Sequence, residues 1–161
     1  MRSLVSIRLL IIVAAVVGAT GCAPLRAPEP VAHDTDRDKP YLVLRLGERR
    51  LYLHDGDGTP QSFLVAIGKK PWETPTGRFQ ILEMIQNPDF LKVNWNDPSH
   101  TGGTIPPGPT NPLGLRWIGF THAYGWTIGF HGTQNVALLG QAVSHGCVRM
   151  SNADVVRLYS A

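Results

Sequence analysis

Apolar and polar residues alternate along the chain from residue 41 onward, which is the pattern of strands that bury one face. The alternating apolar positions are Leu42, Leu44, Leu46, Leu51 and Leu53, with Gly47 in a turn between the third and the fourth. Side chains two positions apart point to the same face of a strand. The pattern therefore predicts a hairpin whose leucines face the core.

Four further segments have the composition of strands, because branched and aromatic residues dominate them. They cover residues 62–67, 78–85, 115–120 and 126–130. Prolines and glycines recur throughout residues 87–112, which predicts that this stretch has no regular structure. A loop of this length in a small domain is usually functional.

The clearest helix start lies near the end of the chain, and no segment before Gln134 has a helical period. Ser151 and Asp154 match a capping box, in which the serine hydroxyl faces the first-turn N–H groups. A helix there would place Val155, Leu158 and Tyr159 on one buried face. Together the elements predict a mainly β fold, a small closed or sandwiched sheet with one or two short helices.

The first 22 residues have the features of an export signal. Arg2 and Arg8 precede an apolar run over residues 9–17, which is too short to span a bilayer as a helix. The four residues that end at Cys22 resemble a bacterial lipobox, in which the signal is cut before the cysteine and that cysteine is acylated. We therefore expect a lipoprotein signal. An ordinary cleaved signal with a chance cysteine is the alternative, and both predict export.

Residues 23–40 are rich in proline and charge, which is typical of a tether, so the folded domain is expected over residues 41–161. Loss of the signal changes the formal net charge from +3 to +1, with 13 basic against 12 acidic residues. A charge this small does not favour a nucleic-acid partner. With Cys22 acylated, Cys147 is the single free thiol of an exported chain, and we expect it to have a chemical role.

The most informative segment runs from His131 to Arg149 and contains Cys147. A cysteine attacks acyl groups as a thiolate, so we expect an imidazole or a cation nearby to lower its pKa. His145 lies two positions before Cys147, and on an extended backbone both side chains would share one face. Gly146 permits a tight turn, which would let the N–H groups of residues 146 and 147 point at a developing oxyanion.

At these residues the chain resembles the L,D-transpeptidase family of the YkuD type. The signature of that family is a histidine followed further along the chain by Ser/Thr-His-Gly-Cys and then an Arg or Asn. Here Cys147 follows His131 by sixteen positions, and residues 144–149 read Ser-His-Gly-Cys-Val-Arg. Thr-Pro-Thr-Gly at 74–77 and Asn-Pro-Leu-Gly at 111–114 also recur in the family. The resemblance covers the whole expected domain.

The resemblance implies that Cys147 is the nucleophile and His131 the general base, oriented by a backbone carbonyl near Gly132. The supporting residues would be Ser144, His145 and Gly146, which shape the pocket and the oxyanion site, and Arg149, which attracts the thiolate or a substrate carboxylate. Neither a metal nor a cofactor is implied.

The implied substrate is a peptidoglycan stem tetrapeptide, which loses its terminal D-Ala to form a thioester. An amine of a neighbouring stem would then take the acyl group to give a 3→3 cross-link, a protein lysine would give a tethered protein, and water would make the chain a carboxypeptidase. The implied location is the cell envelope, on the periplasmic side of a membrane. Members of the family usually continue into a final strand, whereas this sequence stops at Ala161, directly after the expected helix. A domain without its last strand is expected to have an unpaired sheet edge and a weakened activity.

Three other interpretations of the motif remain open at this point. The thiol and the two imidazoles are acceptable zinc ligands, although their spacing lacks the usual close pairs. Cys147 is alternatively a buried structural thiol. In the third interpretation the chain is a catalytically idle lipoprotein that binds the cell wall in the groove where the motif lies, and it needs no nucleophile.

The tryptophans fit either glycan stacking or core packing.

Overall fold

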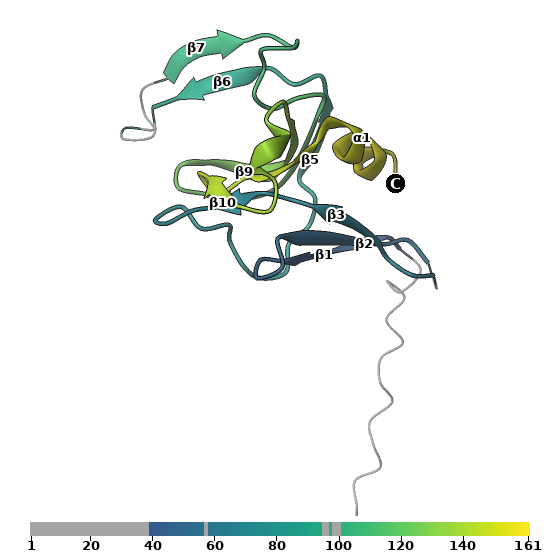
Figure 1. Ribbon diagram of the computed structural model, residues 1–161. Coiled ribbons are helices and arrows are strands. Elements are labelled where there is room, and N and C mark those ends of the chain that lie inside the picture. Colours follow the sequence, from purple (N-terminus) through teal and green to yellow (C-terminus); the bar gives the residue numbers. More distant parts are fainter. Residues whose placement is uncertain (1–38, 57, 95–96, 98–100) are drawn as a thin grey trace, which may run out of the picture. The chain divides into compact units, whose positions relative to one another are not determined.

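The structure is a computed structural model that describes residues 39–56, 58–94, 97 and 101–161 (Figure 1). The expected signal and lipobox, and the tether up to residue 38, lie outside the described residues. The described chain consists mainly of β-strands with one α-helix, which confirms the predicted fold class. No helix among the described residues is long and apolar enough to cross a membrane.

The alternating leucines form the predicted hairpin. Strands β1 (Tyr41–Arg45), β2 (Arg50–His54) and β3 (Gln61–Leu64) make an antiparallel three-stranded sheet in that order. Leu44 pairs with Leu51, so their side chains share one face of this sheet. Leu51 is fully buried, as an inward-facing position of a half-buried strand should be.

A four-stranded sheet in the order β11-β9-β8-β5 holds the second half of the chain. Its strands are β5 (Glu83–Gln86), β8 (Arg116–Ala123), β9 (Trp126–Thr133) and β11 (Val148–Ser151). Strands β9 and β11 run parallel, which requires a crossover connection. The crossover contains the 3-10 helix η1 (Val136–Leu138) and β10 (Ala142–Ser144), which pairs with the short β4 (Ile67–Gly68).

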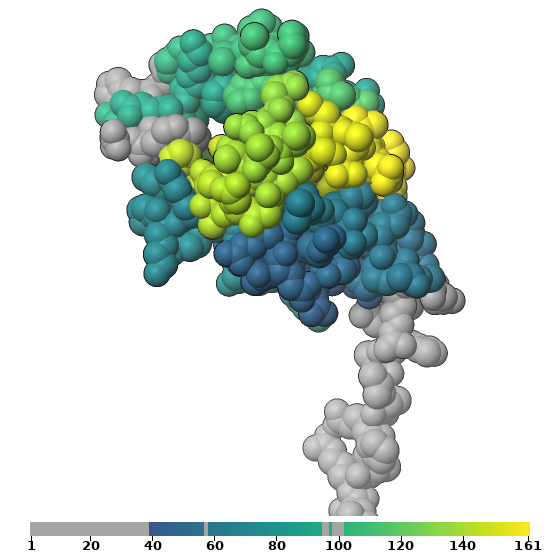
Figure 2. All heavy atoms as spheres, viewed as in Figure 1, coloured from purple at the N-terminus to yellow at the C-terminus, as the bar shows by residue number. Residues whose placement is uncertain are grey.

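The hydrophobic core lies between these two sheets and the C-terminal helix α1 (Asn152–Ser160). Leu51 and Phe63 come from the first sheet, Phe130 and Met150 from the second, and Val155 from the helix. In Figure 2 the C-terminal residues, in yellow, pack against the blue N-terminal strands. Burial of each large apolar side chain contributes roughly 1.5–3 kcal/mol, so these contacts hold the two sheets together.

Residues 87–112 correct the prediction of an irregular loop. Strands β6 (Phe90–Val93) and β7 (Thr101–Ile105) pair as an antiparallel hairpin with an irregular register. Asn111 is fully buried, and its amide donates to the carbonyls of Pro88 at 2.8 Å and Ile105 at 3.1 Å. One side chain therefore ties together the start and the end of this hairpin, which Figure 1 shows at one end of the domain.

Two predicted strands were placed wrongly in part. Residues 78–82 form no strand, and β5 covers only Glu83–Gln86. Phe79 instead packs its ring on Phe120 with centroids 5.4 Å apart. The predicted strand at residues 62–67 is divided into β3 and β4, because Val65 N bonds to Arg49 while Ala66 pairs with Arg149. The composition was right, but strand pairing decides where a strand ends.

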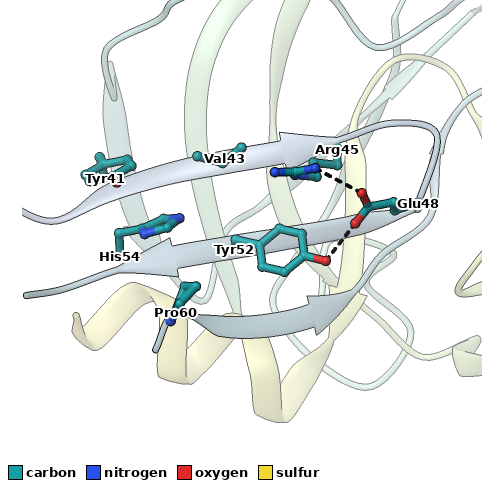
Figure 3. A pocket seen from close by; sticks show the side chains of 7 residues that line it. All are labelled: Tyr41, Val43, Arg45, Glu48, Tyr52, His54 and Pro60. Carbon is teal, nitrogen blue, oxygen red and sulfur yellow. Dashed lines mark hydrogen bonds and ion pairs between the residues drawn. The ribbon is translucent and has the colours of Figure 1, made fainter. Parts of the chain in front are cut away.

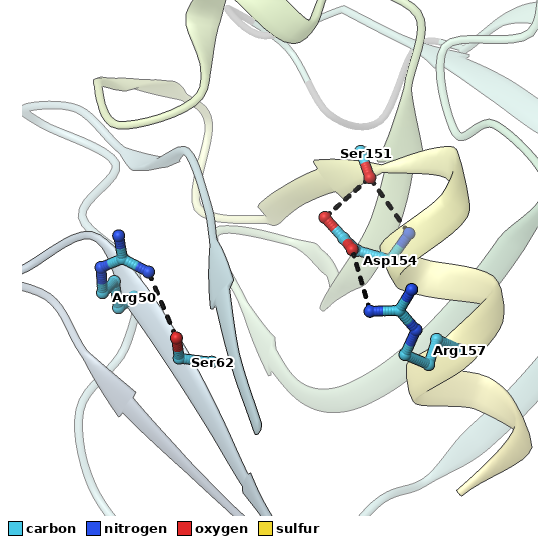
Figure 4. A network of polar contacts seen from close by, with 5 residues as sticks. All are labelled: Arg50, Ser62, Ser151, Asp154 and Arg157. Atoms are coloured by element: carbon cyan, nitrogen blue, oxygen red, sulfur yellow. Dashed lines mark hydrogen bonds and ion pairs between the residues drawn. The ribbon is translucent and has the colours of Figure 1, made fainter. Parts of the chain in front are cut away.

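Helix α1 begins with the predicted cap. Ser151 Oγ accepts from Asp154 N at 3.0 Å and also donates to the Asp154 carboxylate, while Arg157 lies 4.0 Å from that carboxylate (Figure 4). The same view shows Arg50 donating to Ser62 between β2 and β3. The hydroxyl of Ser151 thus satisfies an N–H group that the helix itself leaves unpaired.

We predict that Ser151→Ala lowers the free energy of unfolding by about 1 kcal/mol, because it removes this cap. Urea unfolding at pH 7 measures the change. Arg157→Ala is the matched control, since its ion pair is long and exposed and should cost about 0.5 kcal/mol or less. A larger effect for Arg157→Ala than for Ser151→Ala would show that the ion pair, rather than the cap, stabilises the helix start.

Candidate active site

The spacing between His131 and Cys147 follows from the parallel pairing of β9 and β11. His131 lies near the end of β9, and the crossover of residues 134–147 returns the chain to the neighbouring position. Arg149 is then paired with His131, and Val148 with Phe130. Cys147 therefore enters the sheet beside the strand that carries the imidazole, which brings the two ends of the motif together.

The imidazole of His131 is held on two sides. Its Nδ1 lies 2.7 Å from the carbonyl oxygen of Gly132, so the expected carbonyl contact is present. Since a carbonyl only accepts, Nδ1 carries the proton and Nε2 has a free lone pair. The ring also stacks on Trp117, with centroids 6.0 Å apart and planes 28° apart. This arrangement fixes both the tautomer and the orientation that a general base requires.

Trp117 is itself locked in place. Its Nε1 donates to Glu83 Oε1 at 2.8 Å, and the side chain is only 7% exposed. A Cβ at Gly129 would lie 2.8 Å from the indole, and one at Gly119 would lie 3.1 Å from Nε1. The two glycines therefore leave the space that the indole occupies beside His131.

The carbonyl that orients His131 also has tight surroundings. A Cβ at Gly132 would lie 2.1 Å from Oδ1 of Asn152, and one at Gly114 would lie 2.2 Å from the same atom. Asn152 Oδ1 accepts from Leu115 N at 3.0 Å, which fixes the amide. The first residue of α1 thus packs directly against the backbone next to the imidazole, in a space that only glycine leaves open.

Burial lowers the pKa of His131 from 6.5 to about 4, with a further lowering by the charge of Arg149 and an opposing effect of the Gly132 carbonyl. Only 5% of the residue is exposed, so the imidazolium would lose most of its hydration. The folded protein therefore holds a neutral imidazole at pH 7.

This shift makes stability depend on pH. The unfolded state binds a proton at His131 below about pH 6.5, whereas the folded state does so only below about pH 4. The neutral imidazole therefore makes its full contribution to the free energy of unfolding above pH 6.5. This contribution falls as the pH is lowered through this window, by about 3 kcal/mol at pH 4. We predict that His131→Gln loses less stability than the wild type between pH 7 and pH 4 in urea unfolding. An equal loss in the variant and the wild type would show that protonation of His131 does not cause the change.

Cys147 lies in a surrounding that keeps its thiol neutral. Burial raises its pKa from 9.0 to about 11, although a backbone hydrogen bond with Gly129 and the charge of Arg149 lower it in part. Its Sγ lies 4.0 Å from the carbonyl oxygen of Thr127. Arg149 thus lowers the pKa of the thiol, as a cation was expected to do, but desolvation raises it by more in the resting protein.

The supporting residues differ in what they contact. Ser144 is 1% exposed, and its hydroxyl donates to the carbonyl of Cys147, so it fixes the backbone rather than lining an open pocket. The backbone bends at His145 and Gly146, so it lacks the extended conformation on which the expected shared face depends. The ring of His145 packs on Trp72 with centroids 4.6 Å apart. Gly146 has φ +108°, the positive φ that the expected tight turn requires.

Arg149 brings a positive charge to the site. Its charge lowers the pKa of His131, His145 and Cys147, so the guanidinium lies within electrostatic reach of all three. Desolvation by partial burial lowers the pKa of Arg149 itself, and Cys147 opposes that change. The backbone of Arg149 is fixed by two hydrogen bonds with Ala66, at 2.8 and 2.9 Å. The site can therefore attract an anionic group without moving its backbone.

Other candidate features have different roles. Among the described residues no three His, Cys, Asp or Glu side chains are grouped to hold a metal ion, so the zinc interpretation gains no support. A shallow hollow on the outer face of β1 and β2 is lined by a Tyr41–His54 stack and by the contacts of Glu48 with Arg45 and Tyr52 (Figure 3). None of the residues between His131 and Arg149 lines it.

Three residues near the site were not assigned a role from the sequence. Trp117 stacks on the imidazole, and Asn152 packs against the backbone of Gly132 beside it. Thr74 donates to the carbonyl of Gly146 at 2.8 Å across 72 positions of chain. Of the two roles that the sequence allows for Trp117, glycan stacking and core packing, its burial supports the second. Only the recurring segment at 74–77 gave any signal for Thr74.

Comparisons with known proteins give the family. The model of the L,D-transpeptidase catalytic domain family, YkuD, matches residues 39–161. YqjB of Bacillus subtilis, named as an L,D-transpeptidase, is 35% identical over 122 residues, which cover 74% of this chain and 64% of that protein. YbiS of Escherichia coli, named likewise, is 40% identical over 121 residues, covering 73% of this chain and 33% of that protein. The chain thus spans less than two thirds of the length of these relatives.

Solved structures show the same fold. The NMR structure of the catalytic domain of an Enterococcus faecium L,D-transpeptidase, acylated by ertapenem, superposes with a TM-score of 0.56 at 18% identity, covering 76% of this chain and 89% of that one. An L,D-transpeptidase from Mycobacterium smegmatis gives a TM-score of 0.55 at 20% identity, covering 75% and 53%. With the family model matched over residues 39–161, the chain belongs to the L,D-transpeptidase catalytic domain family.

Proposed function

We propose that the chain is a peptidoglycan L,D-transpeptidase with Cys147 as nucleophile and His131 as general base. The observation that supports this most strongly is the imidazole geometry. Nδ1 is committed to the Gly132 carbonyl, so Nε2 is free to accept a proton beside the strand that Cys147 leads into. A neutral imidazole with Nε2 free to accept is the form that a general base for a thiol requires.

In the acylation step, Cys147 Sγ attacks the carbonyl carbon that precedes the terminal D-Ala of a stem tetrapeptide. Both groups are neutral at pH 7, so the thiol proton passes to Nε2 of His131 as the sulfur–carbon bond forms. The N–H groups of Gly146 and Cys147 stabilise the oxyanion of the tetrahedral intermediate. The carbon–nitrogen bond then breaks, His131 returns the proton to the leaving amine, and D-Ala departs from the thioester.

In the second step an amine of a neighbouring stem attacks the thioester, and its proton passes through His131 back to the thiolate. Acyl transfer to that amine gives a 3→3 cross-link, and a protein lysine as acceptor gives a tethered protein. Arg149 provides a positive charge for a carboxylate of either peptide. Several relatives are named L,D-transpeptidases, and the E. faecium enzyme is described as acylated by ertapenem, which supports a thiol-acylating site.

Mass spectrometry of the protein with a purified disaccharide-tetrapeptide tests this function. We expect release of D-Ala, an acyl adduct on Cys147 and a 3→3 dimer. Tripeptide without dimer would identify a carboxypeptidase, since water would then be the acceptor. A folded protein that releases no D-Ala would favour the idle wall-binding interpretation instead.

We further propose that the protein is exported and anchored through an acyl group on Cys22, in the cell envelope. The basic residues, short apolar run and lipobox-like segment before Cys22 support this. Fractionation of cells that express the full chain tests the anchor. Cys22→Ser should move the protein from the membrane fraction to the soluble extracytoplasmic fraction, and unchanged membrane association would argue against lipidation.

A further inference from the structure

Three consecutive carbonyl groups around the nucleophile each accept a hydrogen bond from a different side chain. The pairs are Trp126 Nε1 with His145 O at 3.3 Å, Thr74 Oγ1 with Gly146 O at 2.8 Å, and Ser144 Oγ with Cys147 O. The three donors come from β9, from the loop after β4 and from β10. The backbone of the nucleophile is therefore held by side chains from three separate segments.

Thr74 occupies the central position of this set. It is 2% exposed, and its hydroxyl accepts from Gly68 N at 2.9 Å while it donates to the carbonyl of Gly146. The two contacts use the single proton and one lone pair, so the hydroxyl has one orientation. A Cβ at Gly68 would lie 2.6 Å from Thr74 N, which shows how closely β4 packs on this residue. Thr74 is thus a fixed donor.

The contact with Thr74 sets the direction of an N–H group. In a planar trans peptide the C=O and the N–H point in opposite directions. Because Gly146 O points at Thr74, the N–H of Cys147 points away from Thr74. Only glycine fits here, since a Cβ at position 146 would lie 2.8 Å from Ile128 Cδ1 and φ is +108°, so the hydrogen bond from Thr74 restrains a peptide that glycine would otherwise leave free to rotate.

We propose that Thr74 is a positioning residue for the oxyanion site, because it directs the Cys147 N–H toward the oxygen of the carbonyl under attack. This inference rests on the proposed acyl transfer at Cys147. As the sulfur–carbon bond forms, the carbonyl π electrons move onto oxygen, and a donor already aimed at that oxygen lowers the barrier. Thr74 touches neither the substrate nor the thiol, and it acts through the peptide of residues 146 and 147.

Two reactions of the same thiol separate this role from a general loss of structure. Acylation by a carbapenem such as ertapenem passes through a tetrahedral oxyanion, whereas alkylation by iodoacetamide displaces iodide from a saturated carbon and forms none. Thr74→Val keeps the shape of the side chain but removes the hydroxyl, and Thr74→Ser keeps the hydroxyl. We expect Thr74→Val to slow acylation by about 100-fold, in line with loss of one oxyanion donor.

Alkylation of Thr74→Val at pH 9 should stay within about threefold of the wild-type rate, because the thiol and its charged neighbours are unchanged. Thr74→Ser should retain acylation. Equal loss in both reactions would overturn the inference, since Thr74 would then merely hold the thiol, and so would unchanged acylation of Thr74→Val. If circular dichroism shows that Thr74→Val does not fold, Thr74→Ala takes its place, and wild-type acylation by a folded Thr74→Ala overturns the inference equally.

The failure of the underlying function gives a different result. A wild-type protein that is alkylated but never acylated contradicts acyl transfer at Cys147 itself, whatever Thr74 does. A wild-type protein that is acylated, with Thr74→Val acylated equally fast, leaves the acyl transfer intact and removes only the role of Thr74.

Discussion

Replacing Cys147 with alanine should abolish acyl transfer while the protein remains folded. The substitution removes the only free thiol among the described residues, and neither His131 nor Ser144 is placed to replace it as a nucleophile. Loss of a nucleophile that acts together with its base commonly costs about 10⁴-fold or more in rate. Release of D-Ala from the tetrapeptide and the mass of the protein after carbapenem treatment both measure the effect.

The fold should survive because Cys147 is partly exposed and packs at the margin of the core. Thermal unfolding of Cys147→Ala should therefore stay close to that of the wild type. Cys147→Ser is a matched variant, since it keeps a polar atom but is a far weaker nucleophile. Turnover retained by folded Cys147→Ala would contradict the mechanism, because the acyl group would then have to reside elsewhere.

The parts of the fold that follow from short-range patterns could be predicted from the sequence. The β1–β2 hairpin needs only the alternation of its leucines and a turn, and the cap of α1 needs only Ser151 and Asp154. The hairpin of β6 and β7 could not be predicted in this way. Gly102 and Gly103 lie within β7, and Pro88 and Pro106 flank the hairpin. Asn111, outside both strands, ties its ends together.

Residues 78–82 illustrate the opposite error. They have the composition of a strand, yet Phe79, Ile81 and Leu82 are all more than 40% exposed. Leu82 N bonds to Gly119, and regular pairing with β8 begins only at Glu83. Composition indicates which residues suit a pleated surface, whereas pairing with the partner strand decides where a strand begins and ends.

The site divides along the same line. One short segment contains Cys147, His131 and Arg149. The sequence alone therefore indicates Cys147 as the candidate nucleophile, His131 as the candidate base and Arg149 as the candidate cation. Thr74 lies 72 positions from the carbonyl that it contacts, and no local pattern connects the two. The direction of the Cys147 pKa shift was also beyond the motif, because it depends on how much water the folded chain excludes.

Alkylation of Cys147 should be slow at neutral pH and should rise with pH without a plateau up to about pH 11. The pKa of the thiol is raised to about 11 and that of His131 is lowered to about 4, so the resting pair is neutral rather than a thiolate with an imidazolium. At pH 7 the thiolate fraction is then about 10⁻⁴, roughly 100-fold below that of a thiol with pKa 9. Iodoacetamide rates between pH 6 and pH 11 measure this profile.

Arg149→Gln tests the same electrostatics with a defined sign. The positive charge of Arg149 lowers the pKa of both Cys147 and His131, so its removal should raise both. Alkylation of the variant at any pH below 11 should therefore be slower than that of the wild type, while the imidazole should titrate at a higher pH.

A plateau in the wild-type rate from about pH 5 upward would contradict the neutral pair, because it would require an imidazolium that holds the thiolate. A neutral pair means that deprotonation and attack occur together, so the barrier depends on a correctly placed Nε2 and on the oxyanion donors rather than on a thiolate stored in advance.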